Sequence, residues 1–76
     1  YPSTPIIINA ANEILVDQFL SGKISFNSII DNLFWVLKDK YYKKYAIKTP
    51  SSLKIIYLID KWSRKKTLEI ILKKKM

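Results

Sequence analysis

The stretch that decides the fold is SIIDNLFWVLKDKY, residues 28–41. Its apolar residues recur at the i, i+3, i+4, i+7 spacing of one helix face: Ile29, Ile30, Leu33, Phe34, Leu37 and Tyr41. Ser28 followed by Asp31 resembles a capping box, with Ser28 as the N-cap and Asp31 in the place usually held by Glu. The spacing therefore predicts an amphipathic helix over residues 28–43.

A second helix is predicted near residues 5–21. Thr4 is expected to be its N-cap and Pro5 its first helical residue, because proline's fixed φ suits that position. Gly22 follows the last apolar residues and can adopt the left-handed conformation that ends many helices. An alternative leaves the first apolar residues extended and makes Asn9 the N-cap.

A third helix is predicted near residues 51–74, after the break at Thr49-Pro50. Its apolar residues gather on one face: Ile55, Leu58, Ile59 and Trp62. The chain shows no internal repeat. We therefore predict an all-α fold, a small bundle of three helices within a single domain spanning residues 1–76.

Composition limits both the core and the available chemistry. The chain has 76 residues, 49% of them hydrophobic, including two Trp, five Tyr and three Phe. That is more apolar surface than a lone short bundle needs, so we expect one face to dock on a partner. The chain has no Cys and no His, and its six carboxylates are scattered. We predict no catalytic, cofactor-binding or metal-binding residue, and hence no self-contained active site.

The net charge of +8 raises two other functional classes. The first is a small basic helical module that binds nucleic acid. It would use four lysines and three interleaved tyrosines as a stacking platform: Lys40, Lys43, Lys44, Lys48, Tyr41, Tyr42 and Tyr45. The second is a membrane-surface element built on the last helix and its lysine tail. Because the chain has thirteen Lys and one Arg, whereas phosphate-binding proteins usually draw on Arg, we favour a solvated basic surface with no nucleic acid and no membrane.

Two amides stand out in the run Asn9-Ala10-Ala11-Asn12-Glu13. On a helical wheel Asn12 falls within the apolar arc of the first helix, with Asn9 also on that arc, whereas Glu13 falls on the solvated side. Burying an unpaired amide costs about 1–3 kcal/mol. We therefore expect Asn12 to be buried and hydrogen-bonded to a neighbouring segment or to another part of the protein.

The last helix carries Asp60 and Arg64 one turn apart, in the favourable acid-first order. Two interpretations stay open. The pair is either an exposed surface contact worth about 0.3–0.5 kcal/mol, or a partly buried bidentate pair that fixes the helix. Trp62, between them in sequence, is expected in the core.

Two segments together resemble a known family. The first comprises Pro5, Asn9-Ala10-Ala11-Asn12-Glu13, Val16, Phe19-Leu20, Ile24 and Phe26. The second, Ser52-Leu53, Ile56, Asp60 and Trp62-Ser63-Arg64, is similar to a Ser/Thr-Leu-x-x-Ile/Val-x-x-x-Asp-x-Trp-Ala/Ser-Arg signature. Both resemble the C-terminal helical domain of 1-deoxy-D-xylulose 5-phosphate reductoisomerases. The lysine-rich middle, residues 38–48, and the Ile- and Lys-heavy last helix depart from the family pattern.

The resemblance implies that the chain is most of a four-helix C-terminal bundle, lacking the bundle's first helix and the NADPH-binding and catalytic domains. It implies an enzyme of isoprenoid precursor synthesis, in the methylerythritol phosphate pathway. Such an enzyme is a homodimer that uses NADPH and a divalent cation, Mg or Mn, in a bacterial cytoplasm or a plastid. This segment would be an inactive scaffold packed on the catalytic domain of the same polypeptide. Its expected structural residues are Asn9, Asn12, Glu13, Asp60, Trp62 and Arg64.

Overall fold

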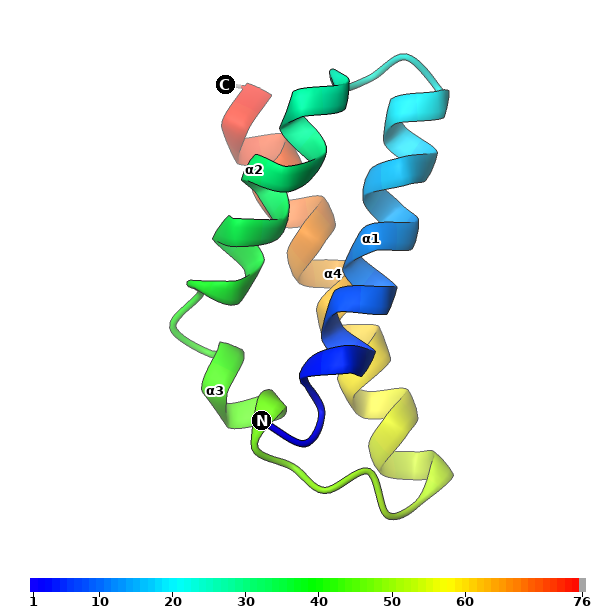
Figure 1. Cartoon of the computed structure of the whole chain (residues 1–76), viewed down its shortest axis with the longest axis vertical. Coiled ribbons are helices and arrows are strands. Elements are labelled where there is room, and N and C mark those ends of the chain that lie inside the picture. The colour runs from blue at the N-terminus through cyan, green and yellow to red at the C-terminus, as the bar shows by residue number, and fades with distance from the viewer. Residues whose placement is uncertain (76) are drawn as a thin grey trace.

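The computed structural model describes residues 1–75, in which helices and their connecting turns form an elongated bundle without β-strands (Figure 1). The helices are α1 (Thr4–Leu20), α2 (Phe26–Leu37), α3 (Tyr42–Ala46) and α4 (Leu53–Lys75). The first two run antiparallel, and α4 packs against both of them. The predicted all-α bundle of three long helices is confirmed, with the five-residue α3 added between the second and the last.

The start of α1 is tied to the end of α3. Ser3, not Thr4, is the N-cap, so the predicted cap is wrong by one residue. The Ser3 backbone N–H donates to the Ala46 carbonyl over 2.9 Å, and the Ser3 hydroxyl donates to the Lys48 carbonyl. Ser3 is fully buried by these contacts. The alternative in which Asn9 caps the helix is also wrong, because Asn9 lies inside α1.

The end of α1 confirms the prediction for Gly22. Its φ is 74°, in the left-handed region that glycine adopts without a Cβ penalty. The Gly22 N–H donates to the Phe19 carbonyl over 3.0 Å, and the Lys23 N–H donates to the Gln18 carbonyl over 2.9 Å. This is the Schellman arrangement, which satisfies carbonyls that the helix end would otherwise leave free.

The helix predicted over residues 28–43 begins earlier than expected. Ser25 is the N-cap of α2, and its hydroxyl accepts a hydrogen bond from the Ser28 backbone N–H over 3.3 Å. Ser28 therefore lies inside the first turn, and the capping box assigned to Ser28 and Asp31 is wrong. Serine occurs at both positions, and the pattern alone did not identify which one caps.

The same helix also ends earlier than predicted, at Leu37. The Asp39 carboxylate accepts a hydrogen bond from the Tyr41 backbone N–H over 2.9 Å, a local contact that competes with continuation of the helix. The chain turns there and re-enters helical geometry in α3. One predicted helix is thus two, separated by a turn.

The core is small and lies where α1, α2 and α4 meet, with one buried residue contributed by α3. Its buried cluster consists of Ile7, Ala11, Val36, Ala46 and Ile59. Two buried hydroxyls on α4 bond within their own helix, Ser63 to the Ile59 carbonyl and Thr67 to the Ser63 carbonyl, each over 2.7 Å. Because these hydroxyls are satisfied, small polar residues can occupy the packed face of α4. None of the described helices is long and apolar enough to cross a membrane.

Candidate functional site

The two motif segments, separated in sequence, meet on one face of the bundle. Arg64 on α4 donates from Nε to the Asp60 carboxylate over 2.9 Å. Its Nη2 forms an ion pair with the Glu13 carboxylate on α1, across 51 positions of sequence. The guanidinium therefore joins α1 to α4 and uses a different nitrogen for each carboxylate.

This cluster is half-exposed. The exposed side-chain fractions are 37% for Arg64, 35% for Asp60 and 57% for Glu13. The hydrogen bond to Asp60, followed by that to Glu13, raises the pKa of Arg64 above its ordinary value, and partial desolvation opposes this only in part. Arg64 is thus a fixed cation. Solvent screening keeps the energy of such an exposed cluster small.

The structure answers the question left open for Asp60 and Arg64. The pair is partly buried, as one interpretation had it, but it is not bidentate, because Arg64 uses one nitrogen for Asp60 and another for Glu13 on α1. Glu13 was correctly placed on a solvated side, but its pairing with Arg64 was missed. The available signal was that Arg64 is the chain's single arginine, the residue type best suited to joining two carboxylates.

The described residues do not bury Asn12, so the expectation that a neighbouring segment of this chain buries it is wrong, and burial by another part of the protein stays a prediction. Asn9 and Asn12 are both exposed, and neither amide bonds to the described residues. The buried stripe of α1 is Ile7, Ala11 and Leu15. Asn12 lies one residue, or 100° of rotation, beyond Ala11, on the stripe that continues through Val16 and Leu20. Both of these stripes contain mainly apolar residues. The helical wheel therefore indicated a core-facing arc that is wider than the face buried within this chain.

Trp62 packs against the core, as predicted, although it is only half-buried. Its indole stacks on the Tyr45 ring with centroids 4.6 Å apart and planes 15° apart. This contact joins α4 to α3. Trp62 therefore supports the packing of the bundle and does not belong to the exposed cluster around Arg64.

The tyrosines expected to form a nucleic-acid stacking platform are largely used in packing. Tyr45 is stacked on Trp62, and the Tyr42 hydroxyl bonds to the Thr4 hydroxyl over 2.6 Å. The ring of Tyr42 also meets Tyr1 edge-on at 6.2 Å. Tyr41 alone of the three is free of such packing, being 46% exposed with Lys40 Nζ 5.1 Å from its ring centroid. The described residues thus form no platform of three free rings, and the nucleic-acid alternative finds no support.

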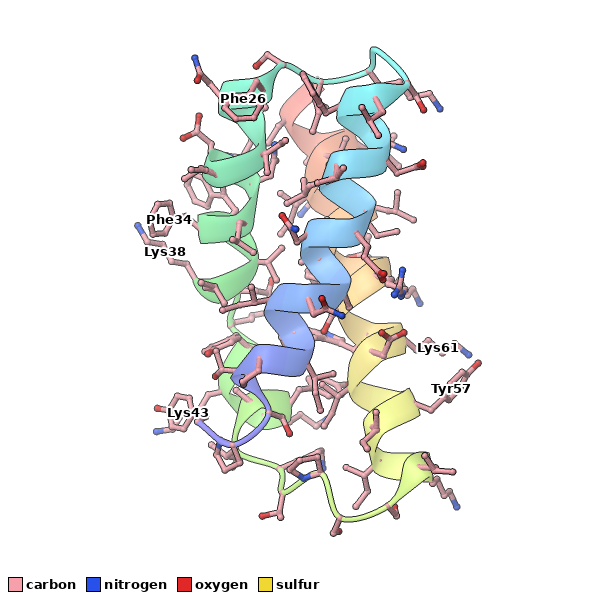
Figure 2. All side chains as sticks on the ribbon, turned by 45° about the vertical axis from the view of Figure 1, so that its right-hand side comes forward. Phe26, Phe34, Lys38, Lys43, Tyr57 and Lys61 are labelled. Carbon is pink, nitrogen blue, oxygen red and sulfur yellow. The ribbon has the colours of Figure 1, made fainter. Side chains whose placement is uncertain are left out.

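An exposed apolar surface, the outer seam, is formed by four side chains of α1 and α2: Val16, Leu20, Phe26 and Ile30. Leu20, Phe26 and Ile30 are 75%, 68% and 59% exposed. The two helices meet at one end of the seam, where the Phe19 and Phe26 rings pack edge-on with centroids 5.6 Å apart. Figure 2 shows Phe26 at the start of α2 and Phe34 farther along the same helix, both on the surface. Exposed apolar side chains at helix spacing on neighbouring helices are typical of a docking surface.

The site thus described belongs to an all-α domain with an interhelical ion cluster and an exposed apolar face. Within residues 1–75, no three acidic side chains lie close enough together to hold a metal ion. The chain belongs to the family described as the DXP reductoisomerase C-terminal domain, whose model matches residues 2–66.

Curated relatives agree with this assignment. The chain is 39% identical over 67 residues to 1-deoxy-D-xylulose 5-phosphate reductoisomerase of Chlorobium limicola, covering 88% of this chain and 16% of the relative. It is 33% identical over 69 residues to the enzyme of Geotalea daltonii, covering 91% and 17%. It is 34% identical over 65 residues to that of Proteus mirabilis, covering 86% and 15%. The chain therefore spans about a sixth of the length of these relatives. No solved structure matches it significantly.

Proposed function

We propose that this domain is the helical scaffold of an NADPH-dependent 1-deoxy-D-xylulose 5-phosphate reductoisomerase, and that its outer seam docks on the rest of the same polypeptide. The rest includes the catalytic domain and a further helix of the bundle. Family membership supports the enzyme class, since the chain matches reductoisomerases over most of its length. The exposed seam is the observation that supports docking.

The outer seam exposes large apolar side chains to water, and contact with another part of the protein would bury them. Single exposed apolar residues are common on soluble domains, whereas the seam has two pairs at i, i+4 spacing on neighbouring helices, with the Phe19 and Phe26 rings in contact between them. Burying a large side chain such as Phe26 or Ile30 contributes about 1.5–3 kcal/mol. An amphipathic helix laid along α1 and α2 would bury both rows together.

Asn12 is the polar residue beside the seam that would hydrogen-bond to the docked segment. It is one turn before Val16 on α1, and its exposed amide has no side-chain hydrogen bond to the described residues. A covering segment would bury this amide and supply its hydrogen-bond partners, which fixes the register of docking. Asn9, one turn earlier, lies on the same exposed side of α1.

The chemistry itself is assigned to the remainder of the enzyme. The reaction rearranges the carbon skeleton of the substrate and then reduces the product with a hydride from NADPH, supported by Mg or Mn. We place the catalytic, nucleotide and metal sites outside residues 1–76. We also propose that the enzyme is a homodimer, in a bacterial cytoplasm or in a plastid. The scaffold contributes by holding elements of the catalytic domain in place.

The test is Ile30→Lys in the full-length polypeptide. A lysine at this seam position places a charge where an apolar cover is proposed, so we expect a loss of docking, a lower Tm and at least tenfold lower turnover of NADPH with 1-deoxy-D-xylulose 5-phosphate. Leu53→Lys is the matched control, because Leu53 is 85% exposed at the start of α4 and lies outside the seam. Equal effects of the two substitutions, or none from Ile30→Lys, would contradict the docking proposal. Absence of turnover in the parent protein would contradict the enzyme assignment.

A further inference from the structure

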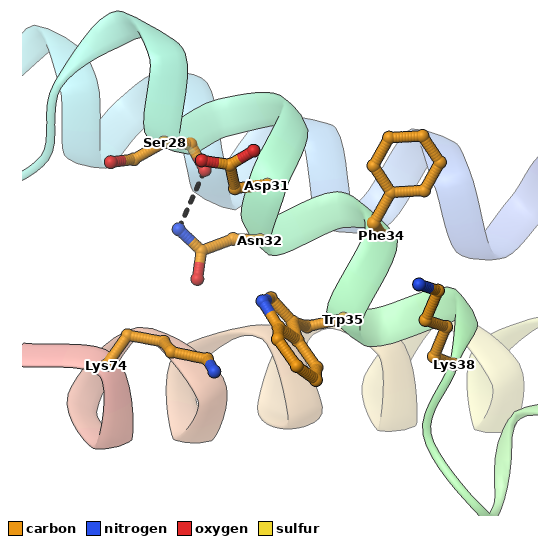
Figure 3. Close-up of a pocket in the computed structure, with 7 residues that line it drawn as sticks. All are labelled: Ser28, Asp31, Asn32, Phe34, Trp35, Lys38 and Lys74. Carbon is orange, nitrogen blue, oxygen red and sulfur yellow. Dashed lines mark hydrogen bonds between the residues drawn. The ribbon is translucent and has the colours of Figure 1, made fainter.

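A second surface lies between α2 and the C-terminal part of α4, and it differs in character from the outer seam. It is a surface cavity of about 480 Å³. Figure 3 shows its lining residues, with the Asn32 side chain and the Trp35 indole of α2 facing Lys74 of α4. An adjoining hollow shares Trp35, Lys38 and Lys74 and continues along α4. We refer to the two together as the basic groove.

Asn32 is the feature that points to a ligand. It is only 5% exposed, and its Nδ2 donates to the Ser28 carbonyl of its own helix over 2.7 Å. Its Oδ1 is buried and has no hydrogen-bond partner among the described residues. A buried acceptor without a partner costs free energy, so an N–H or O–H donor that reaches this oxygen would be favoured.

The charged residues around the groove indicate the charge of the ligand. Four lysines line it without an ion pair among the described residues: Lys38, Lys40, Lys73 and Lys74. Lys66 is different, because it is paired with both Asp39 and Glu69. Lys74 lies over the Trp35 ring with Nζ 3.5 Å from the centroid. One carboxylate without an ion pair among the described residues, Asp31, also lines the cavity, so four unpaired lysines face a single unpaired anion. The groove thus combines an excess of unpaired cations, an aromatic surface that is 49% exposed and one buried acceptor.

We propose that the basic groove binds an acidic, extended segment of a partner protein. A backbone N–H of the segment would donate to Asn32 Oδ1, an apolar side chain would pack on Trp35, and Asp or Glu side chains would pair with the four lysines. A polypeptide fits these features because it offers N–H donors and carboxylates at regular spacing along one strand.

A second copy of this chain does not fit as the occupant. Four of its six carboxylates are engaged in ion pairs: Glu13, Asp39, Asp60 and Glu69. The other two, Asp17 and Asp31, are far apart in sequence, so the chain has no acidic run to offer. Asn32 and Trp35 lie on the side of α2 toward α4, whereas the outer seam lies on its side toward α1. The groove and the seam are therefore separate surfaces, and groove binding does not depend on the proposed enzymatic function. The full-length polypeptide is used in the test below, because a groove covered by another part of the same polypeptide would not bind an added peptide.

The test measures fluorescence anisotropy of a labelled peptide, Glu-Glu-Leu-Glu-Glu-Leu-Glu-Glu, with the full-length polypeptide. We expect saturable binding that weakens as salt rises, and no binding of the peptide with Gln in place of Glu. Lys74→Glu should weaken binding at least tenfold. Lys61→Glu is the matched control, because Lys61 is also an exposed α4 lysine over an aromatic ring, with Nζ 5.9 Å from the Tyr57 centroid (Figure 2). It should change affinity less than about twofold.

The Asn32 contact is tested from the peptide side, so that folding of the protein is not disturbed. In a series of peptides N-methylated at one residue at a time, one member should bind the parent protein about tenfold more weakly, and that difference should vanish in Asn32→Leu. Equal weakening by Lys61→Glu and Lys74→Glu would overturn the proposal, because it would show unspecific attraction. Equal binding of all N-methylated peptides, or binding of phosphatidylserine vesicles but not of the peptide, would also overturn it.

Discussion

Arg64 forms an ion pair with Glu13 although 51 positions separate them in sequence, and it holds Asp60 on its own helix through Nε at 2.9 Å. One arginine therefore connects the two segments by which the chain resembles its family. Because the contact lies at the surface, it contributes little to the free energy of unfolding, and its main effect is to fix the position of α1 relative to α4.

Replacing Arg64 with Gln should lower the free energy of unfolding by about 0.2–1 kcal/mol at low salt, and by less at high salt. Because the pKa of Arg64 is raised from an already high value, its contribution should be constant through neutral and mildly alkaline pH. Urea denaturation measures both effects. Lys61→Gln, which removes a charge from the same helix without breaking an ion pair, should be nearly neutral. A loss equal to that of Arg64→Gln would contradict the specific role of Arg64.

Lys66 should make the domain sensitive to alkali. Its hydrogen bond to Glu69, with a further contribution from Asp39, raises its pKa despite partial desolvation. Because the pKa of Lys66 is higher in the folded than in the unfolded state, its charge stabilises the fold. This stabilisation is complete below the ordinary lysine pKa and is lost as the pH rises through the raised pKa. Lys66→Gln should therefore be less stable than the parent by about 1 kcal/mol at neutral pH, with the difference shrinking in alkali. A difference that grows with pH, or the same behaviour in Lys65→Gln, would contradict this.

Ile59 and Leu58 offer a matched test of the core. Ile59 is fully buried, whereas its neighbour Leu58 is 46% exposed. Ile59→Ala should cost about 2–5 kcal/mol, enough to unfold much of a small domain, because it removes a buried side chain and leaves a cavity. Leu58→Ala should cost well under half as much. Circular dichroism during denaturation reports both, and similar losses would show that the core is placed wrongly.

Replacement of Asn12 should affect the stability of the isolated domain and of the full-length polypeptide differently. In the isolated chain Asn12→Leu should leave Tm nearly unchanged, because the side chain is exposed there. In the full-length polypeptide the same substitution should cost about 1–3 kcal/mol, because it removes hydrogen bonds to the covering segment. Thermal unfolding of the two forms makes the comparison. A neutral effect in both would show that Asn12 lies outside the docked surface.

Helical periodicity and Gly22 were sufficient to predict the fold class and the end of α1. The division between α2 and α3 was not predictable, because the side chain of Asp39 decides it and the apolar spacing continues through Tyr41. Position on a helix wheel also did not decide which of two adjacent apolar stripes of α1 is buried. The buried stripe is the one against which α4 packs, and the small side chains of the buried alanines in α1 allow that helix to approach closely.

For the site, the sequence placed Asp60 and Arg64 together because they lie on one helix, but it had no means of bringing Glu13 to them. Contacts between separate helices depend on how each helix is rotated about its own axis. An error of one residue corresponds to a rotation of about 100° and changes which residues face each other. Asn32 was missed for a related reason. An asparagine in an amphipathic helix gives no sign that its carbonyl oxygen is buried without a donor.

The buried hydroxyls of α4 have a consequence for how such domains are detected. Ser63 and Thr67 are as fully enclosed as Ile59, yet any hydropathy profile counts them as surface residues. Because each donates to its own helix, neither needs a partner from α1 or α2, and each is small enough to let the helices pack closely. A search that scores helices by hydrophobicity alone would rank α4 as peripheral, although it packs against both α1 and α2.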